Sequence, residues 1–323
     1  MKKIYLGSLI IFIFMIFICL AAAQEKPSLR FTWRLSPHHI VLTDGKLAEK
    51  YGLDLKTREF KSGVDVREAL ISGQMDVGDL GGTPTAVAIG KSKDLAIISI
   101  SIYGGGQYRV IVQKDSPYTK FDDLVGKKIA IQIGSSCYEA FEKYIKSRGW
   151  HAKDFQLVNS GPAEAIAALE SKSVEALIFW EPECSIALAK GIGRDIFNFE
   201  NVILNPGFML ARKKFVEENP QATIRFLAAY IDACNFINKR REEAAALVVK
   251  AMERRGQKSE LQVWMTAMSH VHYEPWLTKE LVEAFKEEYW ALMKDGKIKG
   301  EEPNWNEFIL TKYLEDAKKL VKP

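Results

Sequence analysis

Two short segments, far apart in the chain, carry residues suited to bind a small polar molecule. The first is Gly81-Gly82-Thr83-Pro84, in which two glycines leave the backbone accessible and Thr83 adds a hydroxyl donor. The second is Trp180-Glu181-Pro182, which offers an aromatic face and a carboxylate. Because proline is favoured in the first turn of a helix, each segment predicts a new helix, whose free N–H groups attract anions. These residues predict hydrogen bonding and charge recognition of a small solute.

The same order of elements leads into both segments. Ala69-Leu70 ends a predicted helix before the strand that starts at Met75-Asp76-Val77, and Ala168-Leu169 precedes the strand that starts at Val174-Glu175-Ala176. The carboxyl ends of such strands are where open α/β sheets bind ligands. Two ends of this kind predict two lobes that face one cleft.

Further candidate ligand-binding residues lie in loops that follow other predicted strands. Arg34 and Arg109 are the cations near such strand ends. An exposed ion pair is the alternative role for both, and the position of Arg109 within a predicted strand favours the structural role for this residue. The complete set of predicted ligand-binding residues is Trp33, Arg34, Ser36, His38, Gly82, Thr83, Pro84, Tyr103, Gln107, Ser135, Ser136, Trp180, Glu181 and Phe208.

The hydroxyl residues of this set also have a structural interpretation. Ser136 and Glu139 have the spacing of a capping box, which satisfies a helix N-terminus without any ligand. This spacing favours a structural role for Ser136 and leaves Ser135 as the residue that faces the ligand. Thr83 can likewise act only as a helix cap.

The aromatic and acidic candidates have alternatives of the same kind. Trp33, Tyr103 and Trp180 fit either a hydrophobic core or the wall of a ligand site. Glu181 either is simply the extended residue before a proline or binds an ammonium or N–H group of the ligand.

Neither the histidines nor the cysteines predict a metal site. His38 and His39 are adjacent and are expected to project differently from a short loop, and no cysteine or acidic residue has ligand spacing to them. We therefore expect no metal and no cofactor, and a hydrogen-bonding role for His38. Cys137, Cys184 and Cys234 are expected to be buried as small apolar side chains, although one disulfide among them is left open.

The N-terminal residues predict a secretory signal peptide. Lys2 and Lys3 precede an apolar run up to Leu20, and cleavage is expected after Ala23, so that residues 1–23 are removed. The residues before Cys19 do not resemble a lipobox, so no lipid anchor is expected. Without the two lysines the formal charge falls from +4 to +2, which indicates neither nucleic acid nor an anionic membrane as a partner.

From residue 29 to residue 212 predicted strands alternate with helices, the pattern of parallel βαβ units. From Lys213 onward the pattern is helical throughout. Crossings between the lobes are expected near residues 112–114 and 206–212. The predicted division is residues 28–112 plus 208–323 for lobe 1 and residues 113–207 for lobe 2.

Three segments together resemble the periplasmic solute-binding proteins of ABC importers. Residues 73–84 read G-x-M-D-V-G-x-x-G-x-x-P, residues 123–130 resemble the D-L-x-G-K-x-I-A entry into a second lobe, and residues 180–182 resemble a W-x-P turn. The most similar branch serves nitrate, alkanesulfonates, taurine and thiamine-pyrimidine precursors. None of these motifs names the solute.

This resemblance implies a type II periplasmic binding protein fold of the α/β class. Each lobe is then a mostly parallel sheet with flanking helices, and the ligand cleft lies between the lobes. The implied function is capture of a small organic anion or heterocycle, such as a sulfonate, a taurine-like or a pyrimidine-like molecule. The implied setting is a periplasmic monomer that delivers its ligand to an ABC permease in the inner membrane.

Two alternative functions fit the same resemblance. A pyrimidine-precursor synthase-like enzyme of this fold would need a reactive cysteine or histidine cluster and a cytosolic chain, and the predicted signal peptide argues against it. A ligand receptor for a membrane sensor is not separated from transport by the sequence.

Overall fold

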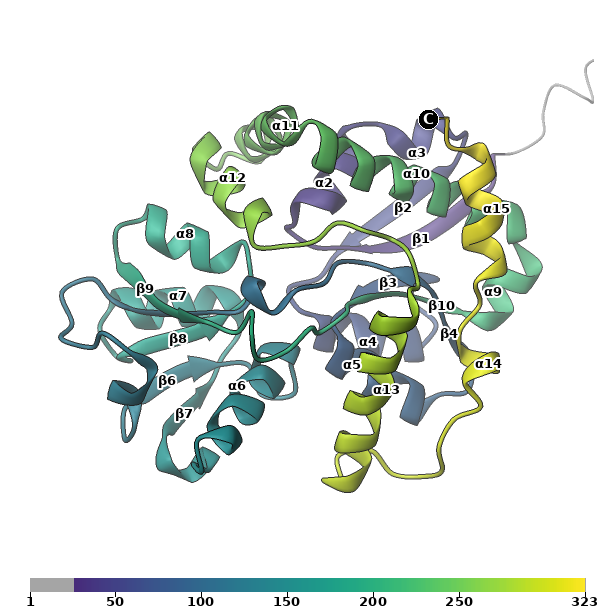
Figure 1. Ribbon diagram of the computed structural model, residues 1–323. Coiled ribbons are helices and arrows are strands. Elements are labelled where there is room, and N and C mark those ends of the chain that lie inside the picture. The colour runs from purple at the N-terminus through teal and green to yellow at the C-terminus, as the bar shows by residue number, and fades with distance from the viewer. Residues whose placement is uncertain (1–25, 323) are drawn as a thin grey trace, which may run out of the picture.

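The computed structural model describes residues 26–322, which form two lobes built on one five-stranded sheet each (Figure 1). The expected signal peptide lies outside the described residues. The strand order is β2-β1-β3-β10-β4 in lobe 1 and β7-β6-β8-β5-β9 in lobe 2. The strands are β1 (Ser28–Trp33), β2 (Asp54–Glu59), β3 (Val77–Leu80), β4 (Leu95–Ile100), β5 (Arg109–Gln113), β6 (Lys128–Ile131), β7 (Gln156–Asn159), β8 (Ala176–Phe179), β9 (Gly193–Asn198) and β10 (Phe208–Arg212).

Helices flank both sheets (Figure 1). Those between the strands are α2 (Pro37–Asp44), α3 (Leu47–Lys50), α4 (Gly63–Ile71), α5 (Gly82–Lys91), α6 (Ser136–Ser147), α7 (Pro162–Glu170) and α8 (Glu183–Ala189). Those after the last strand are α9 (Lys213–Glu218), α10 (Pro220–Lys239), α11 (Arg241–Arg254), α12 (Leu261–Ser269), α13 (Lys279–Lys294), α14 (Trp305–Phe308) and α15 (Lys312–Leu320).

Each sheet contains one strand that runs against all the others. In lobe 1 this strand is β10, which pairs antiparallel with β3 and β4, and in lobe 2 it is β5, which pairs antiparallel with β8 and β9. In both cases the reversed strand has just crossed from the other lobe. The expectation of mostly parallel sheets is confirmed. The single antiparallel strand in each sheet was not predicted from the sequence.

The first crossing between the lobes differs from the predicted one. It lies between β4 and β5, because β5 pairs with the strands of lobe 2, so the expected boundary at residue 112 is wrong. The sequence does not assign β5 to a lobe, because an apolar, β-branched strand has the same residue pattern in either sheet. The chain crosses between the lobes before β5, at the glycines of residues 104–106. The second crossing ends at Phe208, where β10 begins.

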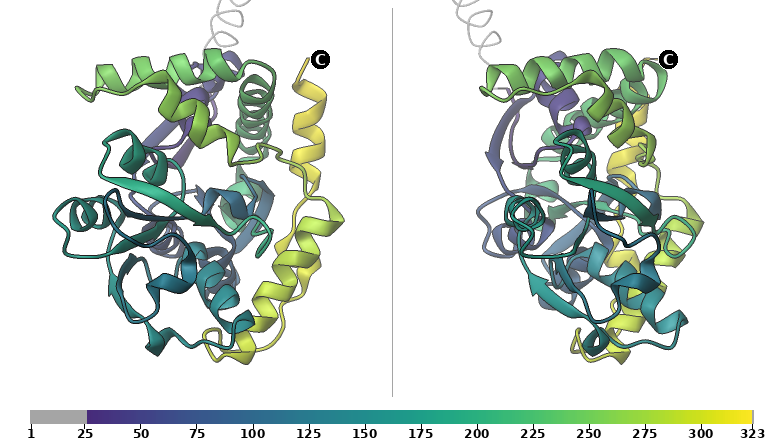
Figure 2. Two further views of the ribbon diagram at one scale, coloured as in Figure 1. Left: turned by 60° about the vertical axis from the view of Figure 1, so that its left-hand side comes forward. Right: turned by 90° about the vertical axis from the view of Figure 1, so that its left-hand side faces the viewer.

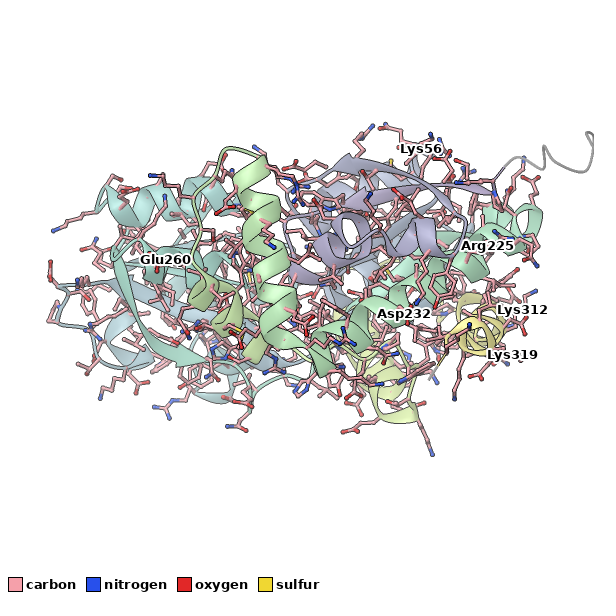
Figure 3. The ribbon with its side chains drawn as sticks, turned by 90° about the horizontal axis from the view of Figure 1, so that it is seen from above. Lys56, Arg225, Asp232, Glu260, Lys312 and Lys319 are labelled. Atoms are coloured by element: carbon pink, nitrogen blue, oxygen red, sulfur yellow. The ribbon has the colours of Figure 1, made fainter. Side chains whose placement is uncertain are left out.

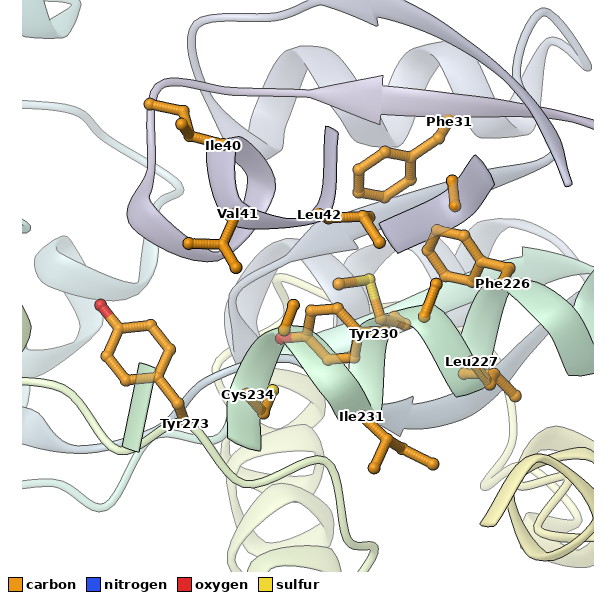
Figure 4. Close-up of a cluster of buried hydrophobic side chains, with 14 of the residues drawn as sticks. Phe31, Ile40, Val41, Leu42, Phe226, Leu227, Tyr230, Ile231, Cys234 and Tyr273 are labelled. Carbon is orange, nitrogen blue, oxygen red and sulfur yellow. The ribbon is translucent and has the colours of Figure 1, made fainter. Parts of the chain in front are cut away.

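One of the two hydrophobic clusters of lobe 1 lies between its sheet and the long helix α10 (Figure 4). Phe226 and Tyr230 of α10 are buried, and the ring of Phe226 lies 5.1 Å from that of Phe31 on β1. Leu42 of α2 belongs to the same cluster. Burying a side chain of this size contributes about 1.5–3 kcal/mol, so this contact fixes the end of β1 and the start of α2, where the candidate residues Arg34, Ser36 and His38 lie.

Two side chains of α10 hold the turn after α3 in place. The Arg225 guanidinium donates to the carbonyl oxygens of Tyr51 and Gly52, each at 3.1 Å, and Asp232 accepts from the Tyr51 hydroxyl at 2.9 Å. Arg225 and Asp232 are labelled along α10 in Figure 3. These bonds connect the α2–α3 segment to the helix that packs beneath it.

The C-terminal helices contact both lobes (Figure 2). Helix α13 packs against α5 of lobe 1, whereas α12 packs against α8 of lobe 2. Lys297, beyond α13, forms ion pairs with Glu139 and Glu142 of α6 in lobe 2. Within residues 26–322, no helix has the length and apolar character that a membrane span requires.

Candidate functional site

A cavity of about 330 Å³ lies between the two lobes. Six of the loops that line it follow the carboxyl ends of β1, β2, β3, β6, β7 and β8, the position at which open α/β sheets bind ligands. Its volume is at the lower end of the range for small-molecule sites, roughly 300–1,000 Å³. The predicted site residues that line the cavity are Arg34, Ser36, His38, Pro84, Gln107, Ser135, Ser136, Trp180 and Glu181.

Two residues predicted for the first side of the cleft are engaged elsewhere. The Thr83 hydroxyl donates to Glu288 of α13 at 2.5 Å, and a side chain at Gly82 would meet the same carboxylate. Neither Gly82 nor Thr83 lines the cavity, whereas Gly81 and Pro84 do. The N-terminus of α5 therefore directs Gly82 and Thr83 toward α13 and presents Gly81 and Pro84 to the cleft.

Three predicted aromatic residues also lie outside the cavity lining. Trp33 is buried in the core of lobe 1, with the Arg255 guanidinium 4.7 Å from its ring. Tyr103 stacks on His272 with ring centres 4.7 Å apart, and Phe208, the first residue of β10, is fully buried in a hydrophobic cluster of lobe 1. Of the two interpretations open for Trp33 and Tyr103, packing is the one that the structure shows.

Several cavity residues have no counterpart among the predicted ones. Glu59 is the last residue of β2, and Phe60 and Lys61 follow it, so the strand-end argument applied to that strand would have found them. Gln257 comes from the segment between α11 and α12, and no sequence signal connects that segment to the cleft. The remaining unpredicted polar residues of the lining are Asp79, Tyr108 and Glu183.

Arg34 is held at the cavity wall by a buried carboxylate. Its guanidinium donates to Oδ2 of Asp79 at 3.0 Å, and Ser101 donates to the other oxygen at 2.5 Å. Burial alone would raise the pKa of Asp79, but attraction to Arg34 and hydrogen bonds from His38 and His39 lower it well below its usual value. Asp79 is therefore ionised at neutral pH and fixes the position of the arginine.

The two histidines converge on this carboxylate, contrary to the expectation that they project differently. Nε2 of His38 and Nε2 of His39 each lie 2.9 Å from Oδ2 of Asp79. The three residues place their ligand atoms within 4.8 Å of one another, a spacing that could hold a metal ion. However, the Arg34 guanidinium occupies the same oxygen, and its charge opposes a cation there.

The tautomer of His39 follows from its backbone contact. The Arg34 N–H donates to Nδ1 of His39 at 2.9 Å, so the ring proton of His39 lies on Nε2, toward Asp79. Burial, together with the neighbouring His38, lowers the pKa of His39 to about 4. His39 is thus neutral, with its Nε2–H beside the Asp79 carboxylate, and we interpret the cluster as the support that orients Arg34.

Two hydrogen-bond donors of lobe 1 remain unused at the cavity wall. Nε of Arg34 and Oγ of Ser36 are shielded from solvent and have no hydrogen-bond partner among residues 26–322. Ser36 is the N-cap residue of α2, yet its side chain makes no capping bond. A guanidinium N–H and a hydroxyl beside a helix N-terminus form a donor set suited to an anionic oxygen.

Glu181 is not free to bind a ligand ammonium. Its carboxylate accepts from Arg109 at 2.6 Å and from the N–H of Ser185 at 3.0 Å, and Arg109 also pairs with Asp195 at 2.5 Å. Arg109 does form an ion pair, with Glu181, but the pair is buried and not exposed as expected. The Glu181–Pro182 peptide bond is cis.

The two serines at the start of α6 differ from their expected roles. Ser135 is the N-cap residue and accepts from the N–H of Tyr138 at 3.3 Å, so the predicted capping box at Ser136 is wrong by one residue. Oγ of Ser136 instead accepts from the N–H of Thr83 at 3.3 Å and so connects the two lobes. Sequence spacing alone does not distinguish the two serines, because either can precede the first helical turn.

Comparison with known proteins agrees with this architecture. The sequence profile of the NMT1-like family matches residues 23–253. The chain belongs to this family. A candidate aliphatic sulfonates-binding protein of Bacillus subtilis is 33% identical over 200 residues, which are 62% of this chain and 60% of that protein. The taurine-binding periplasmic protein of Escherichia coli is 26% identical over 221 residues, which are 67% of this chain and 68% of that protein.

Solved structures show the same fold. The alkanesulfonate-binding protein of Xanthomonas axonopodis pv. citri, bound to MOPS, superimposes with a TM-score of 0.78 at 20% identity and covers 90% of this chain and all of its own. The aliphatic sulphonate-binding protein of Escherichia coli gives a TM-score of 0.74 at 23% identity, with 88% and 92% covered. The fold expected from the sequence, that of a type II periplasmic binding protein, is confirmed.

Proposed function

We propose that this chain is the extracytoplasmic substrate-binding protein of an ABC importer and that it captures a small organic anion of the sulfonate type. The lobes would close on the solute, and the closed protein would deliver it to a permease in the membrane. The observation that carries this proposal is the pair of unused donors, Nε of Arg34 and Oγ of Ser36, at the wall of the inter-lobe cavity.

The electrostatics of the donor set support an anionic ligand. Arg34 is always charged, and its Asp79 partner leaves one N–H direction open. A charged donor and a hydroxyl bind a sulfonate or carboxylate oxygen with charge-assisted bonds, which are roughly twice as strong as neutral ones. The relatives named for sulfonates and taurine point to the same class of solute.

The cysteines give no support to an enzyme that uses a thiol nucleophile. Cys137, Cys184 and Cys234 are all buried and unpaired in the described chain. Burial raises the pKa of Cys137 and Cys234 to about 12 and that of Cys184 well above its usual value. A thiol in this state is protonated at neutral pH and does not act as a nucleophile.

Calorimetric titration of the mature protein with ethanesulfonate, propane-1-sulfonate, taurine, acetate and nitrate tests the proposal. We expect one solute per chain and saturable binding of at least one sulfonate. Arg34→Met should weaken that binding by about 30-fold or more, because truncating one partner of a buried charge pair costs about 2–5 kcal/mol. A folded protein that binds none of these anions, or an R34M variant that binds normally, would contradict the proposal.

A further inference from the structure

Glu183 is a carboxyl of the cavity lining that the fold leaves without a partner. Its Oε2 atom is shielded from solvent and accepts no hydrogen bond from any residue of the described chain. Glu181, two residues earlier, has both of its oxygens satisfied by Arg109 and by the backbone of α8. The two glutamates of this turn thus differ, since only Glu183 has an unused acceptor.

Burial raises the pKa of Glu183 to about 8, and its own backbone N–H and the more distant charge of Arg34 lower it only in part. A carboxyl in this state lacks the cation that would stabilise its charge. A ligand that brings a cation into the cavity would supply that stabilisation.

The unused groups of the cavity are divided between the lobes. Arg34 and Ser36 of lobe 1 carry free donors, and Nδ1 of His38 in the same lobe is also without a partner. Glu183, the first residue of α8 in lobe 2, carries the unpartnered carboxyl oxygen. Trp180 also lines the cavity from lobe 2, and an indole face attracts a cation. The site therefore complements a small molecule with a negative end toward lobe 1 and a positive end toward lobe 2.

We propose that the solute is an aminated organic anion, whose protonated amine binds Glu183 while its sulfonate or carboxylate binds Arg34 and Ser36. This inference rests on the proposed function and narrows its substrate class. Glu183 would be the residue that distinguishes an aminosulfonate from a plain alkanesulfonate of the same size. A site that hydrogen-bonds an amine rejects the analogue that lacks it, because the carboxyl then stays buried and unpaired.

Other charged groups face the same cavity or act on Glu183, and they set the background for any pH effect. From lobe 1 they are Glu59, Lys61, Arg34, His38 and Asp79, and from lobe 2 they are Glu181 with its partners Arg109 and Asp195. In the Glu183→Gln variant all of these groups are retained, so a difference between the variant and the wild type reports on Glu183.

The test compares taurine with propane-1-sulfonate, in which a methyl group replaces the amine at nearly equal size. Calorimetry on the wild type, Glu183→Gln and Glu164→Gln gives the affinity ratio of the two ligands for each protein. Glu164 is the matched control, because it is an exposed first-turn carboxylate of α7 in the same lobe and does not line the cavity. Circular dichroism confirms that each variant is folded.

We expect the wild type and E164Q to prefer taurine and E183Q to lose about 10- to 100-fold of that preference, the range of a hydrogen bond to a charged group. Titrations in buffers of different ionisation heat should show that the wild type releases close to one proton per bound taurine at pH 7 and that E183Q does not. Equal taurine preference in all three proteins, or a wild type that binds propane-1-sulfonate more tightly, would overturn the inference. Failure of both sulfonates to bind the wild type would instead refute the proposed function.

Discussion

The Arg109–Glu181 ion pair predicts a large stability difference between two arginine substitutions in one lobe. The Arg109 side chain is 5% exposed and that of Glu181 is 2% exposed, and their charged atoms are 2.6 Å apart. Replacing Arg109 with methionine retains an apolar stem but leaves Glu181 buried with only one backbone hydrogen bond. Breaking a buried pair in this way costs about 3–5 kcal/mol, which is roughly two to four decades in the folding equilibrium.

Arg148→Met is the matched control for this substitution. Arg148 pairs with Asp122 at 2.7 Å in the same lobe, but the two side chains are 46% and 33% exposed. An exposed pair contributes about 0.2–1 kcal/mol. Urea unfolding followed by circular dichroism should therefore rank the proteins as wild type, R148M slightly below it, and R109M far below both.

A third variant separates charge from packing. In the double variant Arg109→Met with Glu181→Leu, both charges of the pair are gone, and an apolar pair of similar volume is often as stable as the ion pair it replaces. We expect the double variant to recover most of the loss seen in R109M. If R109M unfolded within 1 kcal/mol of R148M, or if the double variant were no more stable than R109M, the argument from an uncompensated buried charge would be refuted.

Two further predictions concern Asp79 and the first crossing between the lobes. The pKa of Asp79 is depressed in the folded protein, so its contribution to stability is complete above its unfolded value of about 3.9 and is lost as the pH falls further. Asp79→Asn should lower the unfolding midpoint at pH 7 and flatten the dependence of that midpoint on pH below about 4. A variant as stable as the wild type at pH 7 would be the contrary result. Gly105→Ala should destabilise the protein strongly, because the added methyl group would lie 2.2 Å from the carbonyl oxygen of Phe199 on the second crossing. Gly106→Ala is the control, since its methyl group would meet only ordinary contacts. Thermal unfolding of the two variants measures this difference, and equal unfolding midpoints would contradict the prediction.

Local patterns were sufficient to predict most of the fold. Leu29, Phe31 and Trp33 alternate with polar residues along β1, and β4 is an apolar run rich in isoleucine; apart from Ser28, both strands fall within residues 29–212, where the sequence predicts strands that alternate with helices. The strands could be predicted because burial of one face of a sheet gives alternating apolar residues, whereas burial of both faces gives a continuous apolar run. The lobe to which β5 belongs could not be predicted, because hydrogen bonding to one sheet or the other leaves no local signal in an apolar strand.

The candidate site was predictable where it depends on strand ends and not where it depends on long-range pairing. The rule that ligands bind at strand ends places Arg34, Ser135 and Trp180 at the cavity, and all three line it. The partners of these residues come from distant parts of the chain. For Glu181 the sequence left a ligand ammonium open as its partner, and that place is taken by Arg109, whose role depends on how β5 and β8 pair.

The engagement of Thr83 by Glu288 was equally hidden, because the C-terminal helices carry no motif that connects them to the cleft. Burial raises the pKa of Glu288 to about 8, even though the hydrogen bond from Thr83 lowers it. Neither the contact nor the shift follows from the sequence around either residue. They depend on the packing of α13 against α5, which only the three-dimensional structure shows.

The most direct test of the central claim is a crystal structure of the mature protein with the sulfonate that binds most tightly in the calorimetric panel. The account predicts that the ligand occupies the cavity between the lobes, with sulfonate oxygens within hydrogen-bond distance of Nε of Arg34 and Oγ of Ser36. A ligand bound outside that cavity, or bound inside it without contact to Arg34, would contradict the account.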